Sequence, residues 1–280
     1  MYRFISWLSN KRLPYKLALA FLPESTRARV WALSHDMYVE TSEQFYGDIY
    51  MKHIVRFLRK HLPLVNLRAL DLGCGHGRIS IRLAKQGFHV VAVEKNQTAL
   101  RRAVEHAKAE GVVIDFRELD ILAETRLGTF DLVLAMEPLS VNGCRSEVEK
   151  LIPIVKQNLR QGGIAVFSVH TRYFNVATAI KFRQLVKAKM ILDDKDSIRW
   201  LQPDDLFSLL NAAGFDSIEI IGIGLVSGME GEPFSSISNP AEYSNEKSKL
   251  LQKIEIEMGL MREVAGCGRY MLALARKAVA

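Results

Sequence analysis

One stretch of the sequence, Leu67 to Lys95, constrains the fold more than any other. It begins with alternating apolar residues that suit a buried strand, turns through three closely spaced glycines and continues as an amphipathic helix. A second apolar run, His89 to Val93, follows and ends at Glu94. This order of strand, glycine turn, helix and strand is typical of α/β folds that bind a nucleotide.

The glycine turn and Glu94 together predict what the fold binds. Gly73, Gly75 and Gly77 lack a Cβ, so a ligand can lie against the main chain while the amides at the helix start face it. A carboxylate just past the second strand can accept two hydrogen bonds from ribose hydroxyls. We therefore expect a cofactor that contains a ribose.

The spacing of the glycines narrows the choice of cofactor. Nicotinamide enzymes usually carry GxGxxG, whereas this chain has GxGxG with Arg78 in the sixth position, which disfavours NAD. The segment DLGCGHG resembles the first motif of class I S-adenosylmethionine-dependent methyltransferases. In that family the loop holds the methionine portion of the cofactor, and the resemblance implies that Cys74 is there to fit the loop.

Further landmarks of the same family follow in order. A helix over Gln97 to Gly111, with Asn96 as its N-cap, leads to a third strand, Val112 to Leu119, that ends at Asp120. The resemblance implies that Asp120 contacts the adenine amino group and that Ile121 packs on the ring. A solvated loop carboxylate or a helix cap is the alternative for Asp120. The predicted cofactor-binding residues are Asp71, Gly73, Cys74, Gly75, Glu94, Lys95, Asp120, Ile121, Met136 and Tyr46.

The next two strands flank a helix that contains a proline. Phe130 to Met136 reads as a fourth buried strand, and Ser146 to Arg160 as the helix after it. Pro153 removes one hydrogen bond there and should kink the helix, which could then form two pieces. Gly162 and Gly163 precede the apolar run Ile164 to Val169, and this part resembles the LxxGGxxxxS segment that leads into the fifth strand of the family.

The end of the chain completes the predicted fold. A helix opened by Pro203 is followed by two apolar runs, Ser217 to Leu225 and Tyr270 to Ala275, which in the family pair antiparallel at one edge of the sheet. We expect an α/β, Rossmann-like fold: a seven-stranded mixed sheet with an antiparallel last strand, helices on both faces and a helical N-terminal cap.

The division of the chain follows from the same pattern. Residues 1–64 are expected to form a helical N-terminal extension or cap, and residues 65–280 the methyltransferase domain, with inserts at about 173–200 and 226–268. Phe45, Tyr46, Tyr50 and His53 lie on a predicted helix of the cap. Tyr46 or Tyr50 could form a lid over the sulfonium, because cations are stabilised by aromatic rings, although aromatic residues at helical spacing are more often core.

Methyl transfer from a sulfonium needs an aligned acceptor, exclusion of water and, for a hydroxyl or acid, a base. His170 ends the predicted fifth strand, at the sheet edge where ligands of open α/β sheets bind. Glu137 follows the fourth strand and occupies the other natural position beside the transferred methyl. Both are candidate catalytic residues, and the alternative for each is a loop residue satisfied by backbone or solvent.

Composition bears on partners and location. The net charge is +7, and residues 1–64 hold ten Lys and Arg against five Asp and Glu, so contact with nucleic acid or an anionic membrane is an open alternative. A membrane contact could be made by an interfacial helix over Met1 to Leu8. We favour the simpler reading, in which an N-terminal helix packs on the domain and its lysines are solvated. No apolar run approaches the length of a membrane span, so a cytoplasmic location is expected.

The three cysteines show no metal-ligand spacing, and no metal is predicted.

The acceptor is constrained mainly by what the motifs lack. Family enzymes that methylate nucleobase or amide nitrogens often carry Asn or Asp, then Pro, Pro and an aromatic residue after strand four, where this chain reads MEPLS. Cys144 lacks the setting expected of the nucleophile in RNA C5-methylation. We therefore expect a small-molecule acceptor, with oxygen as the favoured atom. An RNA, protein or lipid-linked acceptor, and a non-catalytic cofactor-binding partner subunit, remain as alternatives.

Overall fold

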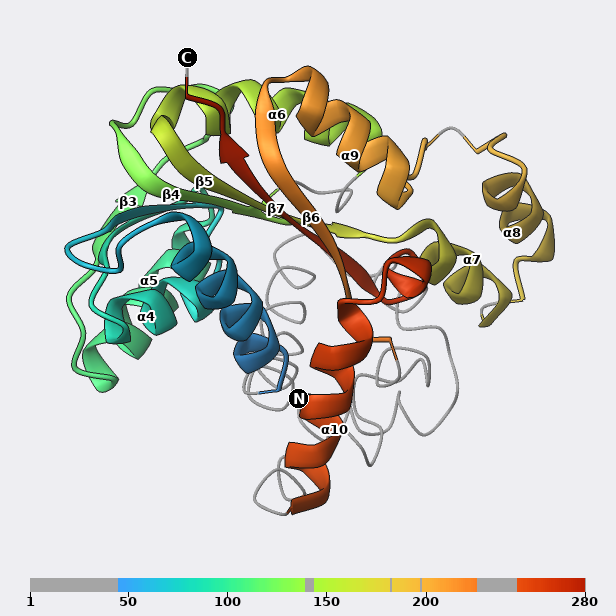
Figure 1. Cartoon of the computed structure of the whole chain (residues 1–280), viewed down its shortest axis with the longest axis horizontal. Coiled ribbons are helices and arrows are strands. Elements are labelled where there is room, and N and C mark those ends of the chain that lie inside the picture. Colours follow the sequence, from blue (N-terminus) through green and yellow to red (C-terminus); the bar gives the residue numbers. More distant parts are fainter. Residues whose placement is uncertain (1–44, 139–143, 182, 197, 226–245, 280) are drawn as a thin grey trace.

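The computed structural model describes residues 45–138, 144–181, 183–196, 198–225 and 246–279 (Figure 1). Within them seven strands form one sheet in the order β3-β2-β1-β4-β5-β7-β6. The strands are β1 (Arg68–Leu72), β2 (His89–Glu94), β3 (Asp115–Glu118), β4 (Phe130–Met136), β5 (Leu159–His170), β6 (Phe215–Ile223) and β7 (Tyr270–Lys277). The first five run parallel, and β7 runs antiparallel to both β5 and β6. The predicted seven-stranded mixed sheet with an antiparallel last strand is confirmed.

Helices cover both faces of this sheet, as predicted (Figure 1). On one face lie α4 (Arg78–Lys85), α5 (Gln97–Ala109) and a helix over residues 45–61, called the cap helix below; on the other lie α6 (Arg145–Asn158) and α9 (Pro203–Ala212). Each face has its own buried apolar cluster. Because both faces are covered, the central strands read as continuous apolar runs rather than as an alternation. None of the helices in the described part of the chain has the length and apolar character needed to cross a membrane.

Several element boundaries differ from the prediction. The third strand is shorter than expected, Asp115–Glu118, and β5 is longer, because it begins at Leu159 and includes Gly162 and Gly163. Gly162 has a φ of +69°, and the pairing of β4 with β5 shifts register near this point, so the two glycines form an irregularity inside the strand. The break expected at Pro153 does not occur: α6 is one helix, held by apolar residues buried on both sides of the proline.

The predicted inserts contain helices of their own. α7 (Arg172–Lys181) and α8 (Leu185–Leu192) follow β5 and extend away from the sheet, while α10 (Glu246–Gly259) and the short η3 (Arg262–Val264) lie between β6 and β7 (Figure 1). The interfacial helix predicted over Met1 to Leu8, like the rest of residues 1–44, lies outside the described residues.

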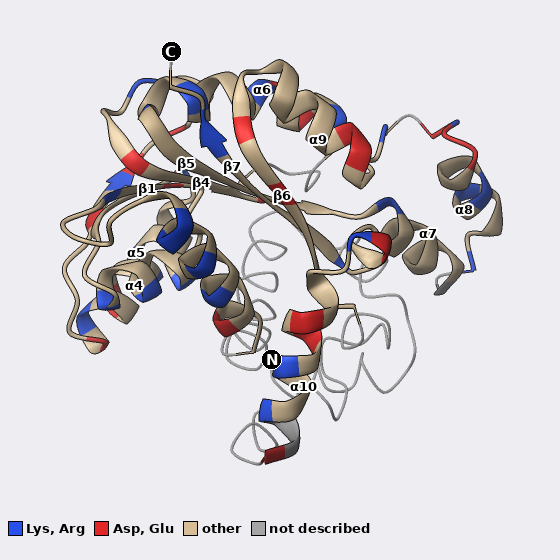
Figure 2. Cartoon of the chain, in the orientation of Figure 1, with Lys and Arg blue, Asp and Glu red and all other residues tan. Residues whose placement is uncertain are grey.

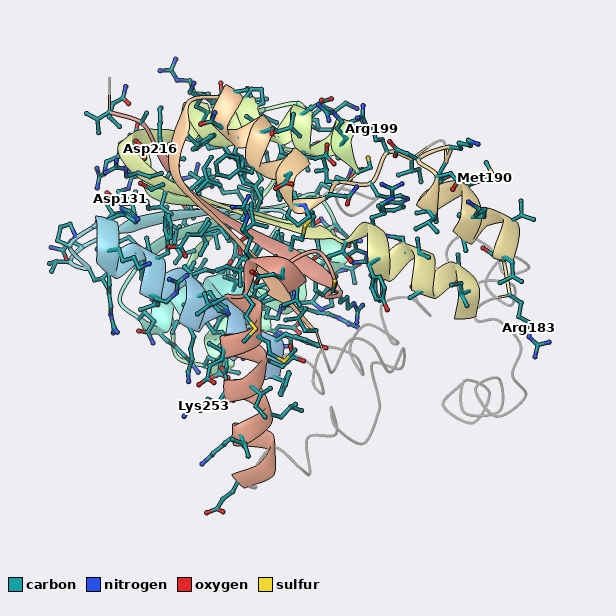
Figure 3. All side chains as sticks on the ribbon, turned by 45° about the vertical axis from the view of Figure 1, so that its right-hand side comes forward. Asp131, Arg183, Met190, Arg199, Asp216 and Lys253 are labelled. Atoms are coloured by element: carbon teal, nitrogen blue, oxygen red, sulfur yellow. The ribbon has the colours of Figure 1, made fainter. Side chains whose placement is uncertain are left out.

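Ion pairs stabilise the amino edge of the sheet, at which the parallel strands begin. Asp131 accepts a hydrogen bond from the Arg68 amide at 2.8 Å and pairs with Arg160, while Asp216 pairs with Arg276 at 2.7 Å. Asp131 and Asp216 lie on the side of the molecule away from Arg183 and Met190 of the α7–α8 insert (Figure 3). These carboxylates are therefore structural, as suggested for Asp131, and they stand apart from the opposite, carboxyl edge.

The cap helix packs on the face that it shares with α4. It buries an apolar stripe consisting of Phe45, Tyr46, Ile49, Tyr50, Ile54, Phe57 and Leu58. Lys60, near its end, is 2.9 Å from Glu219 on β6, and Arg56 pairs with the same carboxylate. The predicted helix with these aromatic residues is confirmed, and its first turns lie near the carboxyl end of β5.

His53 makes the stability of this interface depend on pH. Its side chain is 1% exposed, and its Nε2 has no hydrogen-bond partner among the described residues. Burial, together with the nearby Arg56 charge, lowers the pKa of His53 to about 4. The folded protein holds His53 neutral, whereas the unfolded chain takes up a proton once the pH falls below the ordinary value of 6.5. Stability is therefore present above that value and is lost as the pH falls toward 4.

We expect the wild type to lose roughly 2 to 3 kcal/mol more unfolding free energy than His53→Phe between about pH 7 and pH 4.5. Phenylalanine fills a similar volume and has no proton to gain. Urea denaturation at the two pH values measures the difference, and parallel losses in the two proteins would contradict a buried neutral histidine.

Candidate functional site

The predicted site residues meet because parallel strands end at the same edge of a sheet. Gly73 follows β1, Glu94 ends β2, Glu137 follows β4, and His170 ends β5. β1 is the neighbour of both β2 and β4, and β4 pairs with β5, so the four strand ends are adjacent. The fold therefore brings together residues that are nearly 100 positions apart in the sequence.

The three glycines of the loop serve different purposes. All have positive φ, at +73°, +55° and +79°. A Cβ on Gly73 would lie 2.5 Å from the Cβ of Pro138, and one on Gly77 would lie 3.1 Å from the Cβ of Ala103, so these two allow close packing within the protein. A Cβ on Gly75 would meet nothing within 4 Å. The main chain at Gly75 therefore faces open space, as a loop that cradles a ligand requires.

Glu94 is held against this loop by backbone amides. Its Oε2 accepts a hydrogen bond from the Gly75 amide at 3.0 Å, and its Oε1 accepts one from the Asn96 amide at 2.8 Å. Each carboxylate oxygen has a second lone pair and can accept a further hydrogen bond. The geometry fits the predicted role of Glu94 toward two ribose hydroxyls. Lys95 beside it is largely exposed, with its Nζ 3.9 Å from Asp120 Oδ2.

Asp71 and Cys74 lie below the loop rather than on its open side. Asp71 is 3% exposed and accepts a 2.5 Å hydrogen bond from Ser80, which joins β1 to α4, and burial raises its pKa to about 6. Burial also raises the pKa of the Cys74 thiol well above its usual range. A protonated thiol is a poor nucleophile, which agrees with a packing role for Cys74. Contact of either residue with a cofactor stays a prediction.

The adenine side of the predicted site lies after β3. Asp120 Oδ1 accepts a hydrogen bond from the Leu122 amide at 2.9 Å, so the residue caps a turn, which was the alternative considered for it. Ile121 is buried on the face that α6 covers, and Met136, at the end of β4, is half-buried. The loop between β3 and β4 is held near its end by α6, because Asn158 Oδ1 accepts a 2.7 Å hydrogen bond from the Leu127 amide. The adenine contact of Asp120 stays a prediction.

The two candidate catalytic residues are neighbours. Glu137 Oε2 lies 3.5 Å from His170 Nε2, and Glu137 Oε1 accepts a hydrogen bond from Ser168 Oγ at 3.0 Å. Glu137 has a φ of +56°, in the left-handed region that residues other than glycine rarely adopt. Burial acts to raise the pKa of Glu137, but the hydrogen bond and charge of His170, with the charges of Arg78 and Arg269, outweigh it and leave the pKa below its ordinary value. Glu137 is therefore a carboxylate at neutral pH.

Aromatic rings and a guanidinium surround His170. The His170 ring meets Phe174 and Tyr270 edge to face, with centroids 5.1 and 4.8 Å apart. The Arg269 guanidinium lies 5.2 and 5.1 Å from the centroids of the same two rings. The two rings and the guanidinium thus place apolar surface and positive charge beside His170, the only histidine at a carboxyl strand end in the described sheet.

Sequence reasoning missed Ser168 and Arg269. Ser168 is the serine of the LxxGGxxxxS segment, so a signal for it existed. No sequence signal pointed to Arg269, because its position depends on the path of the second insert just before β7.

The two tyrosines of the predicted lid are buried. Tyr46 stacks edge to face on Phe45 at 5.4 Å and lies beside Gly224, and Tyr50, 1% exposed, has its hydroxyl 3.2 Å from Ser168 Oγ. Both side chains thus contact protein groups at the carboxyl edge. A lid role, and the cofactor contact predicted for Tyr46, stay predictions. Among the described residues no group of three potential metal ligands is present.

Comparison with known proteins decides the family. Residues 64–211, more than half of the 280-residue chain, match the family model described as "Methyltransferase domain". The chain belongs to this family. The predicted resemblance to class I S-adenosylmethionine-dependent methyltransferases is confirmed, and with it S-adenosylmethionine as the cofactor.

The relatives agree with this membership. A ubiquinone biosynthesis O-methyltransferase of Ruegeria sp. (strain TM1040) is 30% identical over 166 residues, which are 59% of this chain and 66% of that protein. A protein of the same name from Ralstonia nicotianae is 28% identical, over 60% of this chain and 70% of its own length. The crystal structure of a magnesium protoporphyrin IX methyltransferase from Synechocystis PCC 6803, with bound SAH, superposes with a TM-score of 0.57 over 91% of this chain and 100% of that one, at 14% identity. The last likeness supports the fold.

Two glycines of this methyltransferase give a matched test of the loop. Gly75 and Gly87 both have positive φ, and a Cβ on either would meet nothing within 4 Å, but Gly87 lies between α4 and β2, away from the carboxyl edge. We expect Gly75→Ala and Gly87→Ala to lose similar stability, about 1 kcal/mol each. Only Gly75→Ala should weaken S-adenosylmethionine binding, by roughly tenfold or more in calorimetry. Equal affinities in the two variants would contradict the loop assignment.

Proposed function

We propose that this methyltransferase transfers the methyl group of S-adenosylmethionine to an oxygen atom of a small-molecule acceptor, with His170 as the base and Glu137 as its partner. The observation that carries the proposal is the 3.5 Å approach of Glu137 Oε2 to His170 Nε2 at the sheet edge that also holds the glycine loop. The names of the relatives, O-methyltransferases of ubiquinone biosynthesis, support oxygen as the atom and a small molecule as the acceptor.

The pair can set the protonation of the imidazole. Because an ionised carboxylate accepts hydrogen bonds and donates none, Glu137 favours the tautomer of His170 that carries its proton on Nε2. The Nδ1 lone pair is then available to take a proton from an acceptor hydroxyl. Loss of this proton makes the oxygen a better nucleophile, which is the contribution expected of a general base.

The residues of the loop and of the β2 end have a binding role. Glu94 would hold the ribose and the Gly75 main chain would lie against the methionine portion, in keeping with the open space at Gly75. When bound, S-adenosylmethionine supplies a methyl group on a positively charged sulfur. The remaining task of the protein is to align the acceptor oxygen with that methyl group and to exclude water.

The surroundings of His170 favour an aromatic or otherwise flat acceptor. Phe174 and Tyr270 offer ring surface, and Arg269 offers a charge that can stabilise an oxyanion. In the described part of the chain, Lys and Arg occur on the cap helix, α4, α5, α8 and α10, with acidic residues on several of the same helices (Figure 2). This spread favours a small acceptor over nucleic acid. A cytoplasmic location stays part of the proposal.

Substitution of the base tests the proposal. We expect His170→Ala to lower turnover by about 10²- to 10⁴-fold and to leave S-adenosylmethionine affinity within roughly threefold of wild type. Glu137→Gln should act in the same direction. His89→Ala is the control, since His89 is exposed at the start of β2, on the opposite edge.

The assay uses radiolabelled S-adenosylmethionine with a panel of phenols, carboxylic acids and amines, followed by mass spectrometry of the product. Label on an oxygen that disappears in His170→Ala supports the proposal. Full turnover in that variant removes His170 as the base, and label found only on amines, or only on added tRNA or protein, contradicts oxygen methylation of a small molecule.

A further inference from the structure

A line of polar side chains runs from the cap helix to the Glu137–His170 pair. The Tyr50 hydroxyl lies 3.2 Å from Ser168 Oγ, and Ser168 Oγ donates to Glu137 Oε1 at 3.0 Å. Glu137 Oε2 then faces His170 Nε2 at 3.5 Å. Tyr50 comes from the cap helix, Ser168 and His170 from β5, and Glu137 from the turn after β4. Three segments that are far apart in the sequence thus contribute to one line of polar contacts.

Counting protons fixes the direction of these hydrogen bonds. Ser168 has a single hydroxyl hydrogen, and it points to the carboxylate of Glu137, which can only accept. Ser168 must therefore accept from Tyr50, and Tyr50 must be the donor. Burial of Tyr50, with the negative charge of Glu137, raises the pKa of its phenol well above the usual range, so Tyr50 stays protonated and remains a donor.

Both hydroxyls are fully enclosed. Tyr50 and Ser168 are each 1% exposed, so neither can replace its partner by bulk water. Donation from Tyr50 polarises the Ser168 hydroxyl and strengthens its hydrogen bond to Glu137. Glu137 needs such a constraint, because its backbone lies in the left-handed region at a φ of +56° and its side chain could otherwise turn away from His170.

We propose that Tyr50 and Ser168 are positioning residues that hold the Glu137 carboxylate against His170 and so fix the proton on Nε2 of the base. The proposal rests on the proposed function of His170, since the two hydroxyls act only through Glu137. It also gives the cap helix a part in catalysis, because the helix delivers one hydroxyl to the site.

Other charged groups face the same carboxylate and must stay in place during a test. Arg78, the first residue of α4, and Arg269, just before β7, both lower the pKa of Glu137. The Tyr270 and Phe174 rings pack on His170 itself. The centroid of the Tyr50 ring also lies 6.4 Å from that of the Tyr270 ring, and Tyr50→Phe keeps this ring while it removes only the hydroxyl.

The test compares Tyr50→Phe, Ser168→Ala and the double variant with wild type by NMR, without any acceptor. Selective ¹³C labelling of glutamate carboxyls, with Glu137→Gln to assign the signal, follows the ionisation of Glu137, and ¹⁵N labelling of histidine rings reports the tautomer of His170. Because loss of a hydrogen bond to a carboxylate favours its protonated form, Ser168→Ala should raise the titration midpoint of Glu137 by about one pH unit. Tyr50→Phe should raise it by less, and the fraction of His170 with its proton on Nε2 should fall in both.

Ser80→Ala is the matched control, because Ser80 is also a buried serine that donates to a buried carboxylate, Asp71, outside this line. It should leave the Glu137 midpoint and the His170 tautomer as they are. Ser168→Ala leaves the Tyr50 hydroxyl without its partner and could unfold, so the double variant, which removes both hydroxyls, repeats the measurement in a protein with no such buried group.

The outcomes separate the two proposals. An unchanged Glu137 midpoint and an unchanged His170 tautomer in Tyr50→Phe and in the double variant would overturn the positioning role. If the NMR changes occur but His170→Ala keeps full turnover, Tyr50 and Ser168 position the pair as inferred, and the pair is not the base.

Discussion

The site depends on a backbone constraint in the turn after β1. Three of five consecutive residues, Gly73 to Gly77, adopt positive φ, a conformation that costs most side chains 1–2 kcal/mol each. Two of these glycines let the turn pack against Pro138 and Ala103, and the third leaves open space. The hydrogen bond from the Gly75 amide to Glu94 then ties the turn to the end of β2. Without this turn the strand ends would still be adjacent, but no main chain would face a ligand.

Two carboxylates with different surroundings lie at the carboxyl edge of the sheet. At the ends of β1 and β2, the carboxylate of Glu94 accepts a hydrogen bond from the Gly75 amide and is proposed to bind the ribose. At the ends of β4 and β5, Glu137 is an anion that is held by Ser168, His170 and nearby guanidinium charges. In the proposed function, Glu94 binds the cofactor, and His170, beside Glu137, takes the proton of the acceptor. Because β1 and β4 are neighbours in the sheet, the proposed cofactor-binding and proton-accepting residues lie next to each other.

Much of this could be predicted from sequence because the decisive signals are local. The glycine loop, the Asn96 cap and the end of β2 at Glu94 each depend on residues close in the chain, and they occur as expected. The start of β5 was misplaced, because two glycines that usually end a strand form an irregularity inside it. Contacts across long separations could not be read from the sequence: no local signal indicated that Ser168, 118 positions later, would lie against the Tyr50 hydroxyl.

The loop and Glu94 are proposed to form a site for S-adenosylmethionine and not for a dinucleotide. Calorimetric titration of the wild-type chain with S-adenosylmethionine and, separately, with NAD⁺ tests this most directly. We expect saturable one-to-one binding of S-adenosylmethionine, weakened when Glu94 is replaced by alanine, and no detectable heat from NAD⁺. Binding of NAD⁺ with similar or higher affinity, or S-adenosylmethionine binding that Glu94→Ala leaves unchanged, would contradict it.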